Sequence, residues 1–365
     1  MFIELHIIQN FVPSCLNRDD TNAPKDCEFG GYRRARISSQ CIKRSIRRYF
    51  GENAEGLGVA GLLGQRTKLL ASQLVDRLVA QGKDRDKALK VVSSVIEAAG
   101  LKTDEAAKTS VLLFLGPDEM DRAAGLILKK WNELAAAQPS GHKAKEKAPP
   151  PVNLSDVLRE GTRAVDVALF GRMVAELPEA RIVNAACQVA HAISTHRVDM
   201  DMDFFTAVDD LQPREESGAG MMGVIEFNSS CFYRYALLDT RQLADNLGSD
   251  RALARTAALA FVQAAVHAIP TGRQNSMAAQ NPPLYVRLIA RDGGSPRNLA
   301  NAFLAPVRPS EAKDLGQASI EKLEKHLADL KRMYGDAGAK LDRTASIYGE
   351  GSIDGLVAAL KEALA

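Results

Sequence analysis

A basic segment near the N-terminus holds the densest group of side chains that could do chemistry. Between residues 25 and 50 only Asp26 and Glu28 oppose its positive charge, in a chain whose formal net charge is +2. Its basic residues are Lys25, Arg33, Arg34, Arg36, Lys43, Arg44, Arg47 and Arg48. Arginine binds phosphate through paired hydrogen bonds, and concentrated positive charge neutralises a nucleic-acid backbone. The segment predicts a phosphate-binding surface, with a solvated helix face as the alternative.

A second candidate for phosphate contact is the turn Pro270-Thr-Gly-Arg-Gln-Asn-Ser276, in which Arg273 follows a glycine. The turn matches neither G-x-G-x-x-G nor the Walker pattern, so it does not indicate a nucleotide-binding loop. A simple turn explains these residues equally well. Arg273 is therefore a candidate RNA contact, with the simple turn as the alternative.

Acidic, histidine and cysteine residues give little support for catalysis or metal binding. The aspartates at 19–20 and 209–210 could act as carboxylate pairs, but aspartate also favours turns. His191 and His196 are five residues apart, which is not the spacing of two metal ligands on one helix face. The five cysteines include no C-x-x-C pair, which favours reduced thiols over zinc ligands or disulfides. We expect no metal and no cofactor.

Strands and a helix must position the basic segment. Residues 2–8 are typical of a strand, and 13–34, rich in Asp, Asn, Pro and Gly, of a long functional loop. A helix is expected to start at Ser38 or Ser39, which are good N-caps, and to end at Gly51.

Farther along the chain, helical periodicity alternates with strand patterns. Residues 66–137 predict several amphipathic helices, and 138–151 form a polar, Pro- and Lys-rich loop. Strict alternation from Val198 to Phe204 predicts the first strand of a β-hairpin over 198–235. A helix at 249–268, a strand at 284–290 and helices at 309–334 and 352–364 follow. This order favours an α+β fold, with a mixed sheet and helices packed on one side.

The N-terminal residues lack the basic and long apolar regions of a signal peptide. The sequence also contains no run of about 18 apolar residues, so no membrane span is expected. Together with the reduced thiols, this predicts a cytoplasmic protein without a membrane partner.

Several blocks of sequence indicate a relationship to a known protein family, which composition alone does not. They are Pro13-Ser-Cys-Leu-Asn-Arg-Asp-Asp20 with Lys25-Asp26, Phe29-Gly-Gly-Tyr-Arg-Arg-Ala-Arg-Ile-Ser-Ser-Gln40 with Lys43-Arg44, Gly171-Arg-Met173, Ala190-His-Ala-Ile-Ser-Thr-His196, Phe205-Thr-Ala-Val-Asp-Asp-Leu211, Glu226-Phe227 and Phe232-Tyr-Arg-Tyr-Ala236. In this order, over most of the chain, they closely resemble the CasC family, the backbone subunits of the type I-E CRISPR Cascade complex. Residues 53–165 and the C-terminal tail resemble it only in character.

The resemblance implies a fold of three parts. A modified RNA-recognition-motif (ferredoxin-like) palm would comprise 1–52, 186–197 and 229–365. A helical finger insertion would comprise 53–185, and a β-hairpin thumb 198–228. The chain lacks the aromatic signature of ordinary RNA-recognition motifs, so such a palm is expected to grip the RNA backbone instead of stacking bases.

The resemblance also implies a function without catalysis. The family binds and coats CRISPR guide RNA and presents it for pairing with target DNA in antiviral defence, so sequence is read by base pairing. The implied partners are the guide RNA, target DNA through the guide, other copies of the chain and other Cascade subunits. An RNA-guided endoribonuclease that cuts RNA in the same groove is the alternative, because related type III subunits cut RNA with a loop aspartate.

Site residues follow from the basic segment and the matched blocks. The expected RNA-binding residues are Lys25, Arg33, Arg34, Arg36, Ser38, Gln40, Lys43, Arg44, Arg47, Met173, Phe205 and Arg273. The resemblance puts Met173 and Phe205 where the thumb interrupts the RNA stack, as a wedge. In the loop at 138–151, Lys143, Lys145 and Lys147 are expected to contact target DNA.

Overall fold

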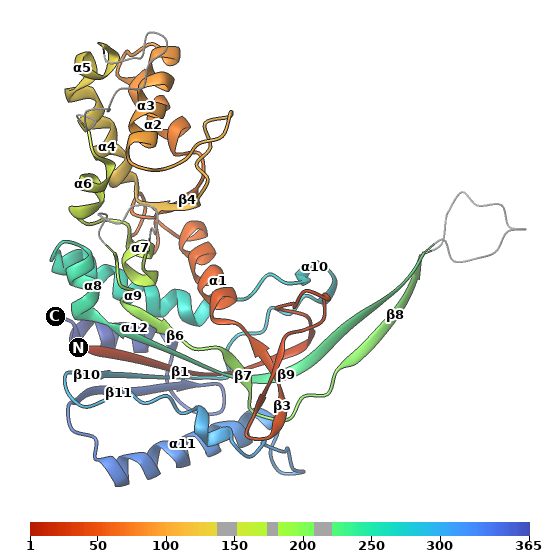
Figure 1. Ribbon diagram of the computed structural model, residues 1–365. Coiled ribbons are helices and arrows are strands. Elements are labelled where there is room, and N and C mark those ends of the chain that lie inside the picture. The colour runs from red at the N-terminus through yellow and green to blue at the C-terminus, as the bar shows by residue number, and fades with distance from the viewer. Residues whose placement is uncertain (137–151, 174–181, 208–220) are drawn as a thin grey trace, which may run out of the picture. The chain divides into compact units, whose positions relative to one another are not determined.

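The computed structural model describes residues 1–136, 152–173, 182–207 and 221–365 (Figure 1). The chain divides into two compact units. Unit 1 comprises Met1–Glu52, Gln188–Leu238 and Leu259–Ala365, and unit 2 comprises Asn53–Cys187 and Asp239–Ala258.

Unit 1 is built on an antiparallel sheet with the strand order β11-β10-β1-β9-β7-β3-β2. These strands are β1 (Phe2–Ser14), β2 (Asp26–Phe29), β3 (Tyr32–Ile37), β7 (Ala192–Ser194), β9 (Met221–Asp239), β10 (Tyr285–Arg291) and β11 (Ala339–Ser346). The short strand β6 (Cys187–Val189) precedes β7. At one end of the sheet β1 pairs antiparallel with β10, and β10 with the edge strand β11. The predicted α+β fold is confirmed, with an antiparallel sheet in place of a mixed one.

The expected loop over 13–34 contains regular structure. Its second half is a hairpin in which β2 pairs with β3, from Asp26 opposite Ala35 to Phe29 opposite Tyr32. Gly30 and Gly31 join the strands with φ values of +64° and +78°. A two-residue turn with positive φ at both positions matches the twist of paired strands, and glycine adopts it without strain.

The basic helix begins where its sequence predicts. α1 spans Ser39–Glu52, one residue beyond the expected end. The Ser38 side chain caps it, since its Oγ accepts a hydrogen bond from the Cys41 amide at 3.2 Å. Ile42, Ile46 and Phe50 are buried along one face. Helical periodicity therefore directs the basic residues between them to the outer surface.

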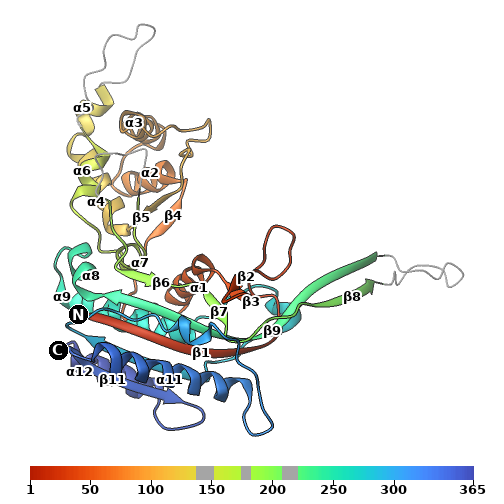
Figure 2. The ribbon, with the colours of Figure 1, turned by 60° about the horizontal axis from the view of Figure 1, so that its bottom comes forward.

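Helices and turns cover the sheet of unit 1. Figure 2 shows α11 (Leu315–Tyr334) running along it, with α12 (Ile353–Ala363) near β11. Leu323 and Leu327 of α11 pack with buried sheet residues and with the turn η1 (Ala300–Phe303). After β9 the chain forms α8 (Thr240–Asn246), which belongs to unit 2, α9 (Arg251–His267), which is divided between the two units, and α10 (Gln274–Met277) of unit 1.

The predicted β-hairpin is present. β8 (Asp201–Ala207) pairs antiparallel with the first part of β9, from Asp201 opposite Phe227 to Ala207 opposite Met221 (Figure 1). One face of the hairpin carries exposed apolar side chains, namely Met202, Phe204, Met222 and Val224.

Unit 2 is mainly helical. Its helices are α2 (Leu70–Ala80), α3 (Arg85–Ala98), α4 (Pro117–Lys129), α5 (Trp131–Ala136), α6 (Leu154–Arg159) and α7 (Val165–Phe170), together with α8 and the first part of α9. Strands β4 (Gln65–Thr67) and β5 (Leu113–Leu115) pair with each other. The apolar faces of α2, α3, α4 and α6 pack into one core. Within the described ranges of the chain, we find no helix with the length and apolar character needed to cross a membrane.

Candidate nucleic-acid interface

A basic cleft of about 380 Å³ opens on unit 1. The residues that line it are Leu16, Asn17, Arg18, Asp19, Asn22, Cys41, Arg44, Ser45, Arg48, Thr271, Gly272 and Arg273. Four arginines from the loop after β1, from α1 and from the turn before α10 thus meet at one hollow. The convergence of guanidinium groups from three separate segments makes an anion-binding surface.

Helix α1 supplies two of these arginines from consecutive turns. Arg44 and Arg48 are four residues apart, so they lie on the same helix face. Arg48 also forms an ion pair with Glu52 at 3.0 Å, and both side chains are largely exposed. Arg44 is exposed and has no ion pair among the described residues. Its guanidinium is therefore free to bind phosphate.

Close packing of two loops brings Arg273 to the cleft. A Cβ atom at Gly272 would lie 2.6 Å from the Cys15 carbonyl oxygen and closer still to that of Leu16, so only glycine fits there. Arg273 itself has φ +46° and precedes α10. Its Nε atom is buried and has no hydrogen-bond partner in the described part of the chain. The position of Arg273 beside three other arginines in the lining of the cleft favours an anionic ligand.

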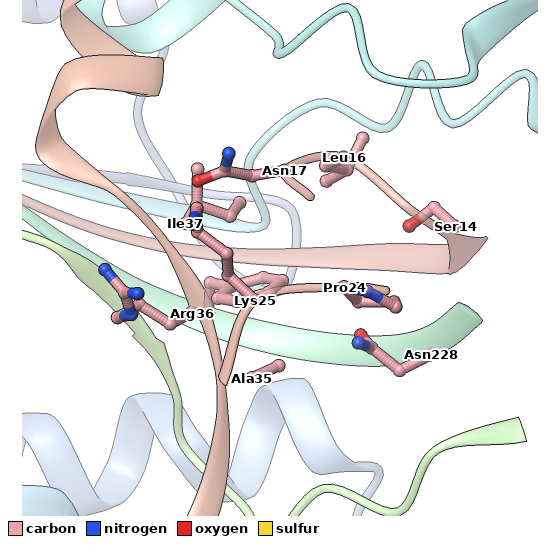
Figure 3. A pocket seen from close by; sticks show the side chains of 10 residues that line it. Ser14, Leu16, Asn17, Pro24, Lys25, Ala35, Arg36, Ile37 and Asn228 are labelled. Atoms are coloured by element: carbon pink, nitrogen blue, oxygen red, sulfur yellow. The ribbon is translucent and has the colours of Figure 1, made fainter. Parts of the chain in front are cut away.

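A second, narrower hollow adjoins the cleft and shares Leu16 and Asn17 with it. Figure 3 shows Asn17, Lys25 and Arg36 around this hollow. The Asn17 side-chain oxygen accepts a hydrogen bond from the Ser38 amide, and its carbonyl accepts one from the Lys25 amide, both at 2.8 Å. Asn17 therefore ties the loop to the start of α1 and to the β2–β3 hairpin.

The start of α1 is fixed by a histidine as well as by Ser38. His191 Nδ1 accepts a hydrogen bond from the Ser39 amide at 3.1 Å and lies 3.4 Å from Arg36 Nη1. Burial, reinforced by Arg36, lowers the pKa of His191, so the ring is neutral and can accept. Ser38 is buried and its hydroxyl serves the cap, whereas Gln40 is exposed. Of these two expected contacts, Gln40 is the accessible one.

Arg34 does not lie on the binding surface. It is fully buried, and its guanidinium donates to the carbonyls of Ser194 at 3.0 Å, Phe303 at 2.6 Å and Leu304 at 3.3 Å. Burial lowers the pKa of this arginine. A side chain that already serves three carbonyls in the protein interior is not available to phosphate. The expectation of an RNA contact from Arg34 was wrong, because its burial depends on segments far away in the sequence.

The other expected residues of the basic segment lie at or near the surface. Arg33 is exposed and forms an ion pair with Asp26. Lys43 and Arg47 are half-buried on α1. The expected DNA contacts at 143, 145 and 147 lie outside the described residues.

The two expected wedge residues are held in different ways. Phe205 lies opposite Gly223 in the hairpin, and a Cβ at Gly223 would be 2.5 Å from the Phe205 Cζ atom. The ring therefore lies across the glycine, half-buried against the partner strand. Met173, in unit 2, is 76% exposed. Neither is a fully buried core residue.

The loop aspartates take part in turn structure. Asp19 Oδ1 accepts hydrogen bonds from the Thr21 amide at 2.9 Å, the Thr21 hydroxyl at 2.8 Å and the Ala23 amide at 3.0 Å. The Thr21 hydrogen bonds lower the pKa of Asp19. Among the described residues, no group of three or more His, Cys, Asp or Glu could hold a metal ion. The pair at 209–210 lies outside the described residues.

The expected RNA-binding residues omitted three contributors to this interface, although Arg48 belongs to the basic segment. Arg18 and Arg48 line the cleft, and Asn17 orders its loop. Arg48 could have been chosen from its four-residue spacing to Arg44. Arg18 and Asn17 stand in the first matched block, but nothing in their types indicates which side chain points outward.

Comparisons with known proteins identify relatives of the whole chain. The family model described as "CT1975-like protein" matches residues 3–359. A chain of a solved "CRISPR RNA-guided surveillance complex, pre-nicking" is 31% identical, with a TM-score of 0.83 and coverage of 99% of this chain and 100% of that one. A chain of another "CRISPR RNA-guided surveillance complex" is 26% identical, with a TM-score of 0.73 and coverage of 100% and 99%. No curated protein matches the sequence.

The family match spans nearly the whole chain, and both solved relatives cover it from end to end. This chain belongs to the CT1975-like protein family, and its fold is that of subunits of CRISPR RNA-guided surveillance complexes.

Proposed function

We propose that this chain binds and coats CRISPR guide RNA as a repeating backbone subunit of a surveillance complex of the type I-E Cascade kind. The observation that carries the proposal is the cleft in which Arg18, Arg44 and Arg273 converge, on a chain whose fold matches such subunits throughout. Guanidinium groups from separate segments can hold consecutive phosphates of one strand.

The sheet of unit 1 favours recognition of the RNA backbone over base stacking. Three tyrosines of β9 and β10 that could have stacked on bases are buried, and their hydroxyl groups form hydrogen bonds within the protein. Tyr233 contacts His6 at 2.9 Å, Tyr235 contacts Glu4 at 3.1 Å, and Tyr285 contacts Glu324. An RNA held through its phosphates leaves its base edges free for pairing, which suits a guide.

In the proposed assembly, unit 1 acts as the palm, unit 2 as the fingers, and the β8–β9 hairpin as the thumb. Several copies line up along one guide, and Phe205 with Met173 interrupts the stack of bases at each thumb. Target DNA joins through pairing with the guide, and the lysines at 143, 145 and 147 contact its backbone. Other Cascade subunits complete the complex.

Co-expression with a CRISPR array tests the proposal. We expect the purified protein to carry a protected RNA of discrete length, and Arg44→Gln combined with Arg273→Gln to reduce the amount carried. Lys325→Gln with Lys361→Gln, on α11 and α12 of the same unit, removes the same charge away from the cleft and serves as the control. Protein that purifies without RNA would refute the proposal.

We propose that the chain has no catalytic role, since the Asp19 carboxylate is engaged by its own turn. Incubating the assembled complex with labelled guide-complementary RNA and a divalent metal tests this. We expect the RNA to stay intact. Periodic cleavage that Asp19→Ala or Asp20→Ala abolishes would establish an endoribonuclease instead.

A further inference from the structure

A buried ion pair in unit 2 has no part in the basic cleft. Arg172 Nη1 lies 2.7 Å from Oε1 and 2.8 Å from Oε2 of Glu119, and the two side chains are 2% and 1% exposed. The same Arg172 nitrogen donates to the Phe114 carbonyl at 3.1 Å. Glu119 Oε2 also accepts from the Gly116 amide at 2.7 Å, at the start of α4. The pair thus joins the segment after α7 to the first turn of α4.

The backbone around Arg172 is equally constrained. Arg172 exchanges two backbone hydrogen bonds with Val183, at 2.8 and 2.9 Å. Gly171 has φ +80°, and a Cβ there would lie 2.8 Å from the Val183 carbonyl oxygen and 2.9 Å from the Ala185 amide. Only glycine allows this approach. The segment is therefore fixed on both sides of its peptide chain and by its arginine side chain.

The next residue, Met173, is among the most exposed apolar side chains of the described chain. A strongly fixed segment ends directly in an exposed methionine. Stability alone does not explain the ion pair, because buried ion pairs are often replaced by apolar residues without loss of stability. Burial raises the pKa of the Glu119 carboxyl despite the neighbouring guanidinium. In addition, Arg172 Nε and Nη2 have no partner among the described residues. Desolvation of these groups opposes folding.

We propose that Arg172 and Glu119 are positioning residues, which fix the segment Gly171–Met173 so that Met173 is presented outward to the bound guide RNA. This role rests on the proposed function, since it assigns Met173 a contact with guide. The pair orients Met173 by removing freedom from the backbone that carries it, and it does not touch RNA itself.

The test replaces both charges together, as Glu119→Leu with Arg172→Met, because a single change would leave a buried charge unpaired. Hydrogen exchange of the full-length protein reports the fixed segment without any RNA. We expect the amides of Arg172 and Val183 to exchange at least tenfold faster, while the thermal midpoint changes by only a few degrees. Guide binding should weaken by about the factor seen for Met173→Ala. The matched control is Arg77→Met with Asp121→Leu, which removes a 2.7 Å pair from the surface of the same unit.

Each outcome decides one claim. Unchanged amide exchange at residues 172 and 183 in the double variant would overturn the positioning role. The role would also be overturned if exchange became faster and the double variant still bound guide normally, while Met173→Ala bound guide weakly. If the double variant unfolds, the single variant Arg172→Lys, which keeps Glu119 and a positive charge, takes its place. It should fold and show slow exchange at residues 172 and 183, and failure to do so would also overturn the positioning role. Normal guide binding by Met173→Ala would refute the proposed contact of Met173 and leave the exchange result standing as evidence for the fixed segment.

Discussion

Two regions of unit 1 use arginine side chains in opposite ways. In the cleft, Arg44 is exposed without an ion pair among the described residues, and Arg273 Nε has no partner there. At the β10–β11 edge, Arg287 donates to Asp342 at 2.7 and 2.8 Å and to Glu324 at 2.5 Å. Arginine paired with carboxylates stabilises the fold, whereas arginine left unpaired around a hollow favours an external anion.

Arg34 shows that position in the sequence does not decide between these uses. It stands between Arg33 and Arg36 in the basic segment, yet it is buried against protein carbonyls. Gly30 packs equally tightly, since a Cβ there would lie 2.9 Å from the Leu304 carbonyl carbon. Arg34 therefore anchors the hairpin that carries its neighbours.

The largest expected effect is on the free energy of unfolding, in the region of unit 1 where arginines pair with carboxylates. Arg291→Met would leave the Glu4 carboxylate buried without its 2.7 Å partner. Loss of one member of a buried pair costs about 3–5 kcal/mol, so we expect urea unfolding to shift by that amount. Glu4→Leu with Arg291→Met should recover most of the loss. If Arg291→Met were as stable as the parent protein, the paired arginines in this region would not stabilise the fold as we infer.

Arg34→Met should have the next largest effect, because it leaves buried carbonyls without their donor. We expect the free energy of unfolding to fall by about 1–3 kcal/mol. RNA affinity should fall at every salt concentration, with an unchanged slope of log affinity against log salt, since no phosphate contact is lost. The neighbouring Arg33→Gln is the control and should leave stability unaltered. A smaller salt slope at full stability would show that Arg34 does contact RNA.

The smallest expected effect is a pH dependence of the paired edge. Burial alone would raise the pKa of Asp342, but hydrogen bonds from Arg287 and Lys331 hold it below its usual range. A carboxyl with a lowered folded pKa stabilises the fold above its unfolded value of about 3.9, and this is lost as pH falls through the folded pKa. Asp342→Asn should flatten the acid limb of unfolding. An unaltered acid limb would mean that Asp342 contributes nothing there.

Local signals allowed the sequence to predict part of the fold. The start of α1 was confirmed, because Ser38 and the apolar periodicity of Ile42 and Ile46 act within one helix. The β2–β3 hairpin was missed, since Tyr32–Ile37 carries three arginines and lacks the apolar alternation of a strand. Its pairing depends on the glycine turn and on strand β7.

The candidate site was predictable only in composition. The burial of Arg34 depends on carbonyls 160 to 270 residues away, which no local pattern encodes. The approach of Arg273 to the cleft depends in the same way on the packing of Gly272 against residues 15 and 16. The α+β fold and the surveillance-complex relationship were nevertheless indicated by the sequence and are supported by the comparisons.

The salt dependence of guide-RNA affinity tests the central claim most directly. For the assembled chain we predict that Arg44→Gln with Arg273→Gln lowers affinity for all guide sequences alike and leaves the thermal midpoint unchanged. The slope of log affinity against log salt should shrink by about 0.7 per lost phosphate contact. Lys325→Gln with Lys361→Gln should preserve the slope. An unchanged slope in the cleft variant, or a loss confined to one guide sequence, would contradict phosphate binding in the cleft.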